Sequence, residues 1–167
     1  VENSVKLIFE SLRLKELNSV NIAMPITCLN RRSNYALEAR DFLYQGDLGK
    51  LYKKFSLKEK LKILKKIAVA VRYVFDNGFV HNDVKTANIL VASIKPVRVY
   101  LADFDYMGKI GSGSARGTPC FCDNTLIHGG LRLPFLDIYG VAKISAQILF
   151  DVSPEHGLNQ FGDIGSS

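Results

Sequence analysis

Apolar residues recur every three to five positions in three segments of the chain, and each pattern predicts a helix. The first segment covers residues 2–18, where charged residues alternate with the apolar ones. The second begins at Ser56, whose side chain can cap the helix while Glu59 reaches back, and it ends at Asn77-Gly78. Its predicted buried face comprises Leu57, Leu61, Leu64, Ile67, Val71 and Val74. A third helix is predicted near Leu136 to Phe150.

Shorter apolar stretches between these helices have the composition of strands. Residues 21–29 and 35–43 are separated by the polar segment 30–34, which predicts two strands joined by a turn. Three further β-prone segments are residues 79–80, 88–91 and 97–104. A Gly- and Ser-rich loop, residues 108–117, separates them from the last helix.

Composition narrows the class of protein. A chain of 167 residues with 47% hydrophobic residues favours one domain with a buried core. No apolar run reaches about 18 residues, so we expect no membrane partner. Three cysteines are too few for a disulfide scaffold and favour the reducing cytoplasm. The net charge of +6 suits an acidic partner without identifying one.

The lysines of the second predicted helix gather on its outer face, at positions 58, 62, 65 and 66. No aromatic residues are interleaved with them in the way that nucleic-acid surfaces require. We therefore interpret this face as solvated and expect no nucleic-acid partner.

Chemically reactive side chains are concentrated in one short segment. His81, Asp83, Lys85 and Asn88 lie within eight residues, and Asp103 follows Asp83 by twenty positions at the end of a predicted strand. Phosphoryl transfer needs a carboxylate to orient a hydroxyl group, a cation near the phosphate and oxygen ligands for Mg²⁺. The two strands that flank these residues can form a hairpin that brings the groups together.

These motifs resemble those of the protein-kinase family. His81-Asn82-Asp83 is similar to the catalytic-loop triplet, Asn88 to its metal-binding asparagine, and Asp103-Phe104-Asp105 to the metal-binding triplet. Residues 117–121 resemble the substrate-facing loop, and residues 136–140 the central helix with its anchoring Asp137. Order and spacing agree over roughly residues 1–155.

The resemblance implies an α+β, protein-kinase-like fold with a mostly helical lower lobe, short strands and a truncated upper lobe. Residues 1–48 would form the partial upper lobe and residues 49–167 the lower lobe. Glu10 falls at the ion-pair glutamate of the regulatory helix, and Asp47 at the hinge that holds adenine and ribose.

The resemblance also implies ATP and Mg²⁺ as cofactors and a protein Ser/Thr hydroxyl as substrate. Asp83 would orient the hydroxyl, and Lys85 would lie beside the transferring phosphate, as in the serine/threonine branch. Asn88 and Asp103 would hold Mg²⁺. His81 would pack with Phe104 in the stack that links the lobes rather than transfer a proton.

The chain departs from the family pattern at several positions. Asn82 replaces an arginine that would meet a phosphorylated loop, so activation by loop phosphorylation is not expected. Asp105 replaces a glycine, and residues 122–125 replace the usual Ala-Pro-Glu. No Gly-x-Gly-x-x-Gly loop precedes the first helix, and no lysine is present to pair with Glu10. These absences predict a fragment or a trimmed domain, with a naturally minimal kinase as the alternative.

Two other functions stay open. His-Asn-Asp and Asp-Phe-Asp also occur in small-molecule kinases of the choline and aminoglycoside type, although Gly117-Thr118-Pro119 fits protein kinases better. Without the glycine-rich loop, a pseudokinase-like binding module is the second alternative. The set of Asp83, Lys85, Asn88 and Asp103 argues against it, because a module that only binds has no need of all four. The oligomeric state is not indicated.

Overall fold

Two long helices dominate the part of the chain that the computed structural model describes, namely residues 26–29, 36–39, 45–113, 117–118, 120–121 and 130–153. The helical elements are α2 (Leu48–Leu51), α3 (Leu57–Asp76), α5 (Phe135–Phe150) and the 3-10 turns η2 (Tyr52–Lys54) and η3 (Thr86–Asn88). The strands are β1 (Ile26–Leu29), β2 (Ala36–Ala39), β3 (Gly46–Asp47), β4 (Phe79–Val80), β5 (Ile89–Ser93), β6 (Arg98–Leu101) and β7 (Gly108–Lys109). The helix expected over residues 2–18 lies outside the described residues.

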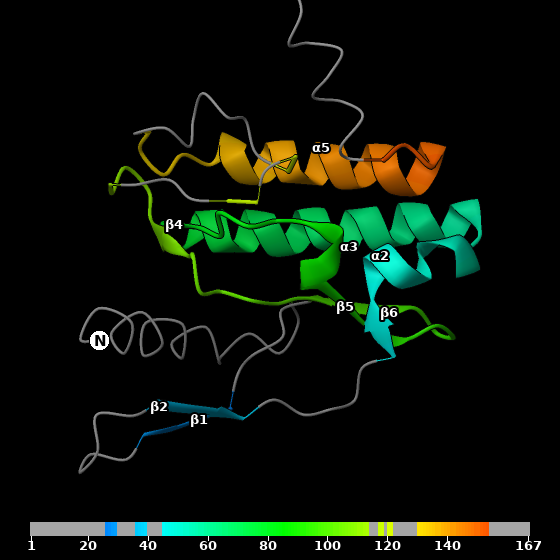
Figure 1. Cartoon of the computed structure of the whole chain (residues 1–167), viewed down its shortest axis with the longest axis horizontal. Helices are drawn as coiled ribbons and strands as arrows, with labels where there is room; N and C mark the ends of the chain where they lie inside the picture. Colours follow the sequence, from blue (N-terminus) through cyan, green and yellow to red (C-terminus); the bar gives the residue numbers. More distant parts are fainter. Residues whose placement is uncertain are drawn as a thin grey trace, which may run out of the picture.

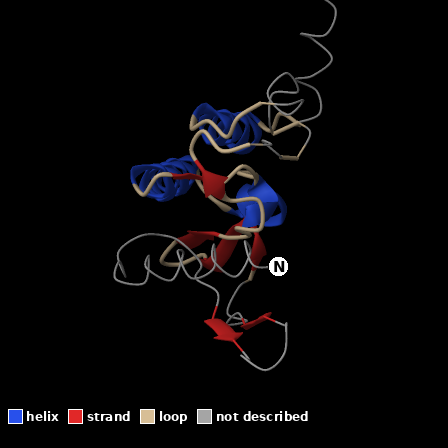
Figure 2. Cartoon of the chain, turned by 90° about the vertical axis from the view of Figure 1, so that its left-hand side faces the viewer, coloured by secondary structure: helices blue, strands red, loops and turns tan. Residues whose placement is uncertain are grey.

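Helix α3 lies between α5 on one side and the β5–β6 hairpin on the other (Figures 1 and 2). It begins as the sequence predicts, because the Ser56 N–H donates to Glu59 Oε2 at 2.8 Å while the Glu59 N–H approaches Ser56 Oγ at 3.4 Å. Helix α5 covers residues 135–150, one residue more than the expected range. The two helices and the hairpin enclose most of the core.

The predicted buried face of α3 is wrong at its first turns. Leu57 is 65% exposed and Leu61 is 53% exposed. The residues of α3 that are buried are Ile63, Ile67, Ala70, Val71 and Val74. A helix turns 100° per residue, so Leu57 and Leu61 point about 100° or more away from the centre of this buried group. The apolar residues of α3 therefore fall into two groups, a buried face and an exposed stripe that contains Leu57 and Leu61.

Three small antiparallel sheets complete the described fold. In the sheet of order β3-β5-β6, Ile89 pairs with Leu101, which confirms the predicted hairpin. Strand β4 pairs with β7, and β1 pairs with β2 within the two stretches expected to form strands. Strand β3 and the short helices α2 and η2 were not predicted from the pattern. Among the described residues, no helix is both long and apolar enough to cross a bilayer.

The core brings the segment after β4 close to α5. Its buried members come from α2, α3, the hairpin and α5, and include Leu48, Ile63, Ile67, Ile89, Val91, Leu101, Ile144 and Ile148. Gly140 of α5 packs directly against Val84, where a Cβ would collide with the Val84 carbonyl oxygen. Glycine therefore permits the close approach of α5 to the segment that carries Asp83.

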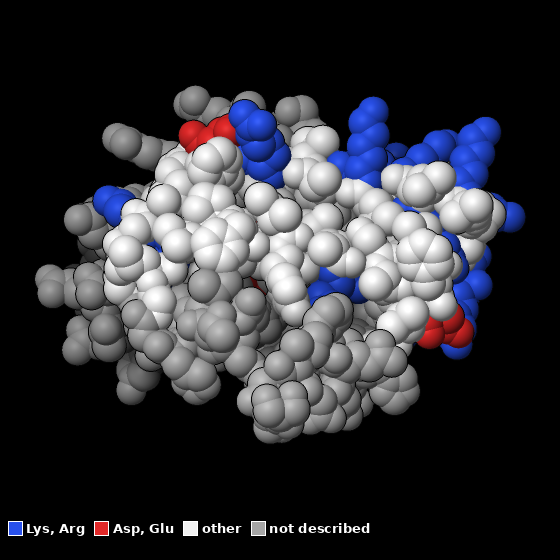
Figure 3. All heavy atoms as spheres, turned by 90° about the horizontal axis from the view of Figure 1, so that it is seen from above, with Lys and Arg blue, Asp and Glu red and all other residues white. Residues whose placement is uncertain are grey.

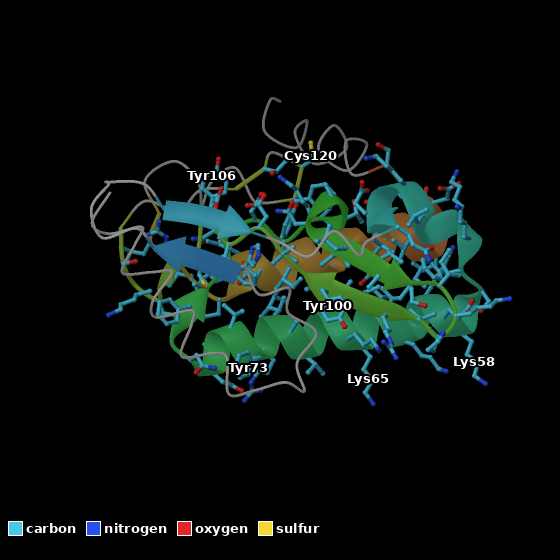
Figure 4. The ribbon with its side chains drawn as sticks, turned by 90° about the horizontal axis from the view of Figure 1, so that it is seen from below. Lys58, Lys65, Tyr73, Tyr100, Tyr106 and Cys120 are labelled. Carbon is cyan, nitrogen blue, oxygen red and sulfur yellow. The ribbon has the colours of Figure 1, made fainter. Side chains whose placement is uncertain are left out.

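Positive charge gathers at one end of the molecule. Eight lysines lie between residues 50 and 66, where Glu59 is the acidic residue, while the rest of the chain has 14 basic and 15 acidic residues. These lysines lie on α2, η2 and the first half of α3, at the right-hand end of the surface in Figure 3. Lys58 and Lys65 extend outward from α3 (Figure 4). The net charge of the whole chain is thus the charge of this one end.

Candidate active site

The segment 81–88 is anchored to α5 by one buried carboxylate. Asp137 accepts hydrogen bonds from the backbone N–H of His81 at its Oδ2 (2.7 Å) and of Asn82 at its Oδ1 (2.8 Å). Burial raises the pKa of Asp137 to about 6, although the two N–H groups act to lower it. This geometry confirms Asp137 as the internal anchor that the sequence predicts.

His81 connects this segment to the end of β6. It is fully buried, its Nε2 lies 3.1 Å from the carbonyl oxygen of Ala102, and its Nδ1 accepts from the backbone N–H of Asp83 at 3.3 Å. These partners assign the proton to Nε2 in a neutral ring. Burial lowers the pKa of His81 to about 4, which keeps the ring uncharged. Its ring centroid lies 4.8 Å from that of Phe104 with the planes tilted by 59°, so the expected packing of the two rings is present.

Three side chains converge on the carboxylate of Asp83. Lys85 Nζ donates to Oδ2 at 2.7 Å, and Thr118 donates to Oδ1 through both Oγ1 (2.5 Å) and its backbone N–H (3.1 Å). Lys85 also donates to Thr118 Oγ1 at 2.7 Å, which closes the triangle. Burial raises the pKa of Asp83, but the hydrogen bonds and the charge of Lys85 outweigh it and lower the pKa below its usual value. Asp83 is therefore ionised at neutral pH.

Asn88 is the third side chain. It follows Asp83 through η3, and its Nδ2 donates to both the carbonyl oxygen and Oδ2 of Asp83, each at 2.9 Å. The amide nitrogen is thus used internally, and the amide oxygen is the atom suited to a cation. Asp103 lies at the same end of the hairpin, because the Ala102 N–H donates to the Asn88 carbonyl oxygen at 2.9 Å.

Asn88 and Asp103 fit a Mg²⁺ ion by their chemistry. They offer hard oxygen ligands, and Mg²⁺ typically takes only one or two protein ligands beside water and substrate phosphates. Within the residues that the structure describes, no three His, Cys, Asp or Glu side chains form a metal cluster. Two protein ligands would leave the remaining positions of the ion to water and substrate phosphates.

Of the remaining predicted nucleotide contacts, the structure describes Asp47, which lies at the end of β3 beside η3. Asp47 pairs with Leu90 across the sheet, and its carboxylate caps α2 through the Lys50 N–H (3.1 Å) and binds Lys50 Nζ (2.9 Å). Asp47 thus has a structural role, and its contact with ribose stays a prediction. Glu10 lies outside the described residues. Sequence reasoning missed the contact of Thr118 with Asp83, for which the Gly-Thr-Pro motif was the available signal.

Comparison with known proteins agrees with this site. A family model described as a protein kinase domain matches residues 2–162. The chain therefore belongs to the protein kinase domain family, whose members use ATP and a divalent metal ion.

Individual relatives are protein kinases. The chain is 36% identical over 85 residues to mitogen-activated protein kinase kinase kinase 1 of Arabidopsis thaliana, which covers 47% of this chain and 14% of the relative. It is 31% identical over 125 residues to the meiosis-specific serine/threonine-protein kinase MEK1 of Saccharomyces cerevisiae. That match covers 68% of this chain and 25% of the relative. It is 30% identical over 106 residues to human calcium/calmodulin-dependent protein kinase type IV. That match covers 60% of this chain and 22% of the relative. The matches thus span a quarter or less of each relative.

The fold has a solved counterpart. The kinase PK-1 of Cydia pomonella granulovirus matches with a TM-score of 0.75 and 22% sequence identity, covering 94% of this chain and 61% of that chain. This likeness confirms the α+β, protein-kinase-like fold.

Proposed function

We propose that the chain carries the catalytic residues of a Ser/Thr protein kinase that uses ATP and Mg²⁺. The observation that carries the proposal is the carboxylate of Asp83, which Lys85, Thr118 and Asn88 bind at once. A buried carboxylate held ionised in one orientation is the group that phosphoryl transfer to a hydroxyl requires.

In the proposed reaction, the hydroxyl oxygen of the substrate forms a bond to the γ-phosphorus of ATP as the bond from that phosphorus to the bridging oxygen breaks. ADP leaves, and the proton of the hydroxyl passes to Asp83. Lys85, 2.7 Å from Asp83, places an ammonium group beside the transferred phosphate. Positioning and charge neutralisation supply most of the rate in this class of reaction.

Asn88 and Asp103 would hold Mg²⁺, which neutralises the phosphate oxygens when bound. Asn88 also fixes Asp83 through Nδ2, so the same side chain would link the metal site to the carboxylate. Asp47 would contact the ribose, and Glu10 would serve the phosphate clamp of the upper lobe. The names of the relatives support a protein substrate over a small alcohol.

Two substitutions in the full-length protein test these roles. Asp83→Asn should lower kcat by 10²- to 10⁴-fold and leave the Kd of Mg²⁺-ATP within about threefold, because the amide cannot take the proton. Asp103→Asn should weaken the binding of Mg²⁺-ATP itself. Asp76→Asn, on the exposed end of α3, is the matched control and should change neither quantity.

Kinetics on a Ser/Thr peptide and calorimetry with Mg²⁺-ATP give the two readings. Equal losses of turnover and binding in both variants would contradict the division of roles. Transfer to choline or an aminoglycoside instead of the peptide would favour the small-molecule kinase. Absence of nucleotide binding by the wild type would leave a pseudokinase-like binding module.

A further inference from the structure

Two consecutive side chains hold the backbone on both sides of the segment Asp103-Phe104-Asp105. His81 binds the carbonyl oxygen of Ala102, immediately before the segment, at 3.1 Å. Asn82 Nδ2 donates to the carbonyl oxygen of Tyr106, immediately after it, at 2.8 Å. We call this pair the His81–Asn82 bracket. Both of its members are fixed through their own backbone N–H groups to Asp137.

The backbone of Asn82 is held in a conformation that few residue types accept. Its φ is 67°, in the left-handed region, where asparagine is tolerated better than most side chains. Asp103 has a φ of 66°. Left-handed conformations of residues other than glycine are concentrated at functional sites, where the surrounding structure enforces them. Asn82 is a member of the bracket and Asp103 directly follows Ala102, while Cys120 and Asp151 also have a positive φ outside it.

The side chain of Asn82 is kept despite an energetic penalty. It is only 4% exposed, and its Oδ1 is buried with no hydrogen-bond partner among the described residues. A buried polar atom without a partner destabilises the folded state. An apolar residue of similar size would avoid this penalty but would lose the bond to Tyr106. The left-handed backbone and the amide donor together explain asparagine at this position.

We propose that Asn82 is a positioning residue that holds the metal-binding segment against the segment of Asp83, and so sets the Mg²⁺ requirement of the reaction. The proposal rests on the proposed function, since it concerns the placement of Asp103 relative to Asp83. Without Asn82, the segment keeps its attachment at Ala102 but loses the one at Tyr106. Asp103 would then sample more than one position, while substrate contacts elsewhere would be unchanged.

Two variants of the full-length protein separate side chain from backbone. Asn82→Gly keeps the left-handed backbone and removes the donor, and Asn82→Asp keeps the size but replaces the donor with an acceptor facing a carbonyl oxygen. Both should raise the Mg²⁺ concentration for half-maximal rate about tenfold and lower kcat, with the KM for the peptide unchanged within about twofold. The loss should be larger for Asn82→Asp. Asn77→Gly is the matched control, because Asn77 Nδ2 also donates to a backbone carbonyl (Tyr73, 2.9 Å) but outside the site.

Hydrogen exchange at the Met107 amide, which donates to the Phe104 carbonyl oxygen at 3.0 Å, gives a reading that needs no activity. We expect faster exchange in both Asn82 variants and wild-type exchange in Asn77→Gly. If the wild type is active, and the Asn82 variants keep its Mg²⁺ dependence and its exchange rate at Met107, the proposal is overturned. If the wild type transfers no phosphate, the proposed function fails. The role of the His81–Asn82 bracket is then tested by exchange alone, and a Met107 exchange rate in the Asn82 variants equal to that of the wild type would overturn it.

Discussion

Thr118 is bound to the carboxylate at the centre of the candidate site, although 35 residues separate it from Asp83. Its hydroxyl group donates to Asp83 and accepts from Lys85, so it fixes the positions of these two charged groups relative to each other. Thr118→Val should lower kcat about tenfold, because it removes a hydrogen bond to a charged group at nearly constant size. Thr118→Ser keeps the hydroxyl group and should stay close to wild type. Equal kcat values for the two variants on a peptide substrate would refute this role.

Neutral His81 should make stability sensitive to acid. Its pKa is about 4 in the folded state against 6.5 for an ordinary histidine, so between these pH values the unfolded state binds more protons. The free energy of unfolding contributed by His81 is complete above pH 6.5 and is lost as the pH falls towards 4. Asp137, whose pKa is raised to about 6, acts in the opposite direction over nearly the same range.

Comparison with His81→Leu isolates the histidine, because Asp137 is common to both proteins. The stability advantage of wild type over His81→Leu should shrink by up to about 3 kcal/mol between pH 7 and pH 4. Urea unfolding at several pH values measures this difference. A difference that is constant with pH would show that His81 is not held neutral.

The sequence predicted those site residues whose partners are near in the chain or whose spacing forms a motif. Asp83, Lys85 and Asn88 lie within six residues, and the structure brings them together. Thr118 and the bond from Asn82 to Tyr106 depend on where distant loops fold back, which local patterns do not encode. Asp47 differs from these residues, because its motif predicts a contact with ribose whereas the structure shows its carboxylate capping α2.

Among the elements, α5 owes its position to Gly140. Alanine normally stabilises a helix interior relative to glycine by about 1 kcal/mol. At Gly140 the added Cβ would collide with the Val84 carbonyl oxygen and lie 2.9 Å from the Val84 Cβ. Gly140→Ala should therefore destabilise the protein by about 1–3 kcal/mol and lower kcat, because Val84 adjoins Asp83.

Ala142→Gly, at an exposed position of the same helix, is the control for helix propensity. It should cost about 1 kcal/mol and leave kcat unchanged. Urea denaturation and peptide kinetics on both variants are the measurements. A Gly140→Ala protein more stable than wild type would show that the helix and Val84 are not in close contact.

The bounds of an element could be predicted where its sequence carries a clear local motif or composition. The capping box fixed the start of α3, and the strand composition fixed the β5–β6 hairpin. Helix α2 is only four residues long, too short for an apolar pattern to repeat, so periodicity does not predict it. The pattern places the exposed Leu57 and Leu61 in the core, because apolar spacing does not distinguish a buried face from an exposed apolar one.

At the scale of the whole molecule, the positive charge of residues 50–66 should dominate binding to anionic surfaces. Replacing Lys58, Lys62 and Lys65 by glutamine should lower the salt concentration of elution from a cation exchanger markedly. The control replaces Arg72, Lys109 and Lys143 by glutamine, which removes the same charge at positions outside residues 50–66. Equal elution of the two triple variants would mean that only net charge matters. Circular dichroism checks that both are folded.

Asp137 also limits how the chain can evolve. Both of its oxygens accept from successive backbone N–H groups, and an asparagine in its place would present an NH₂ group to one of these donors. A glutamate would need one more methylene between α5 and a loop that already touches Gly140. A descendant that carries asparagine or glutamate at this position would therefore lose or distort one of the two contacts that hold the loop to α5.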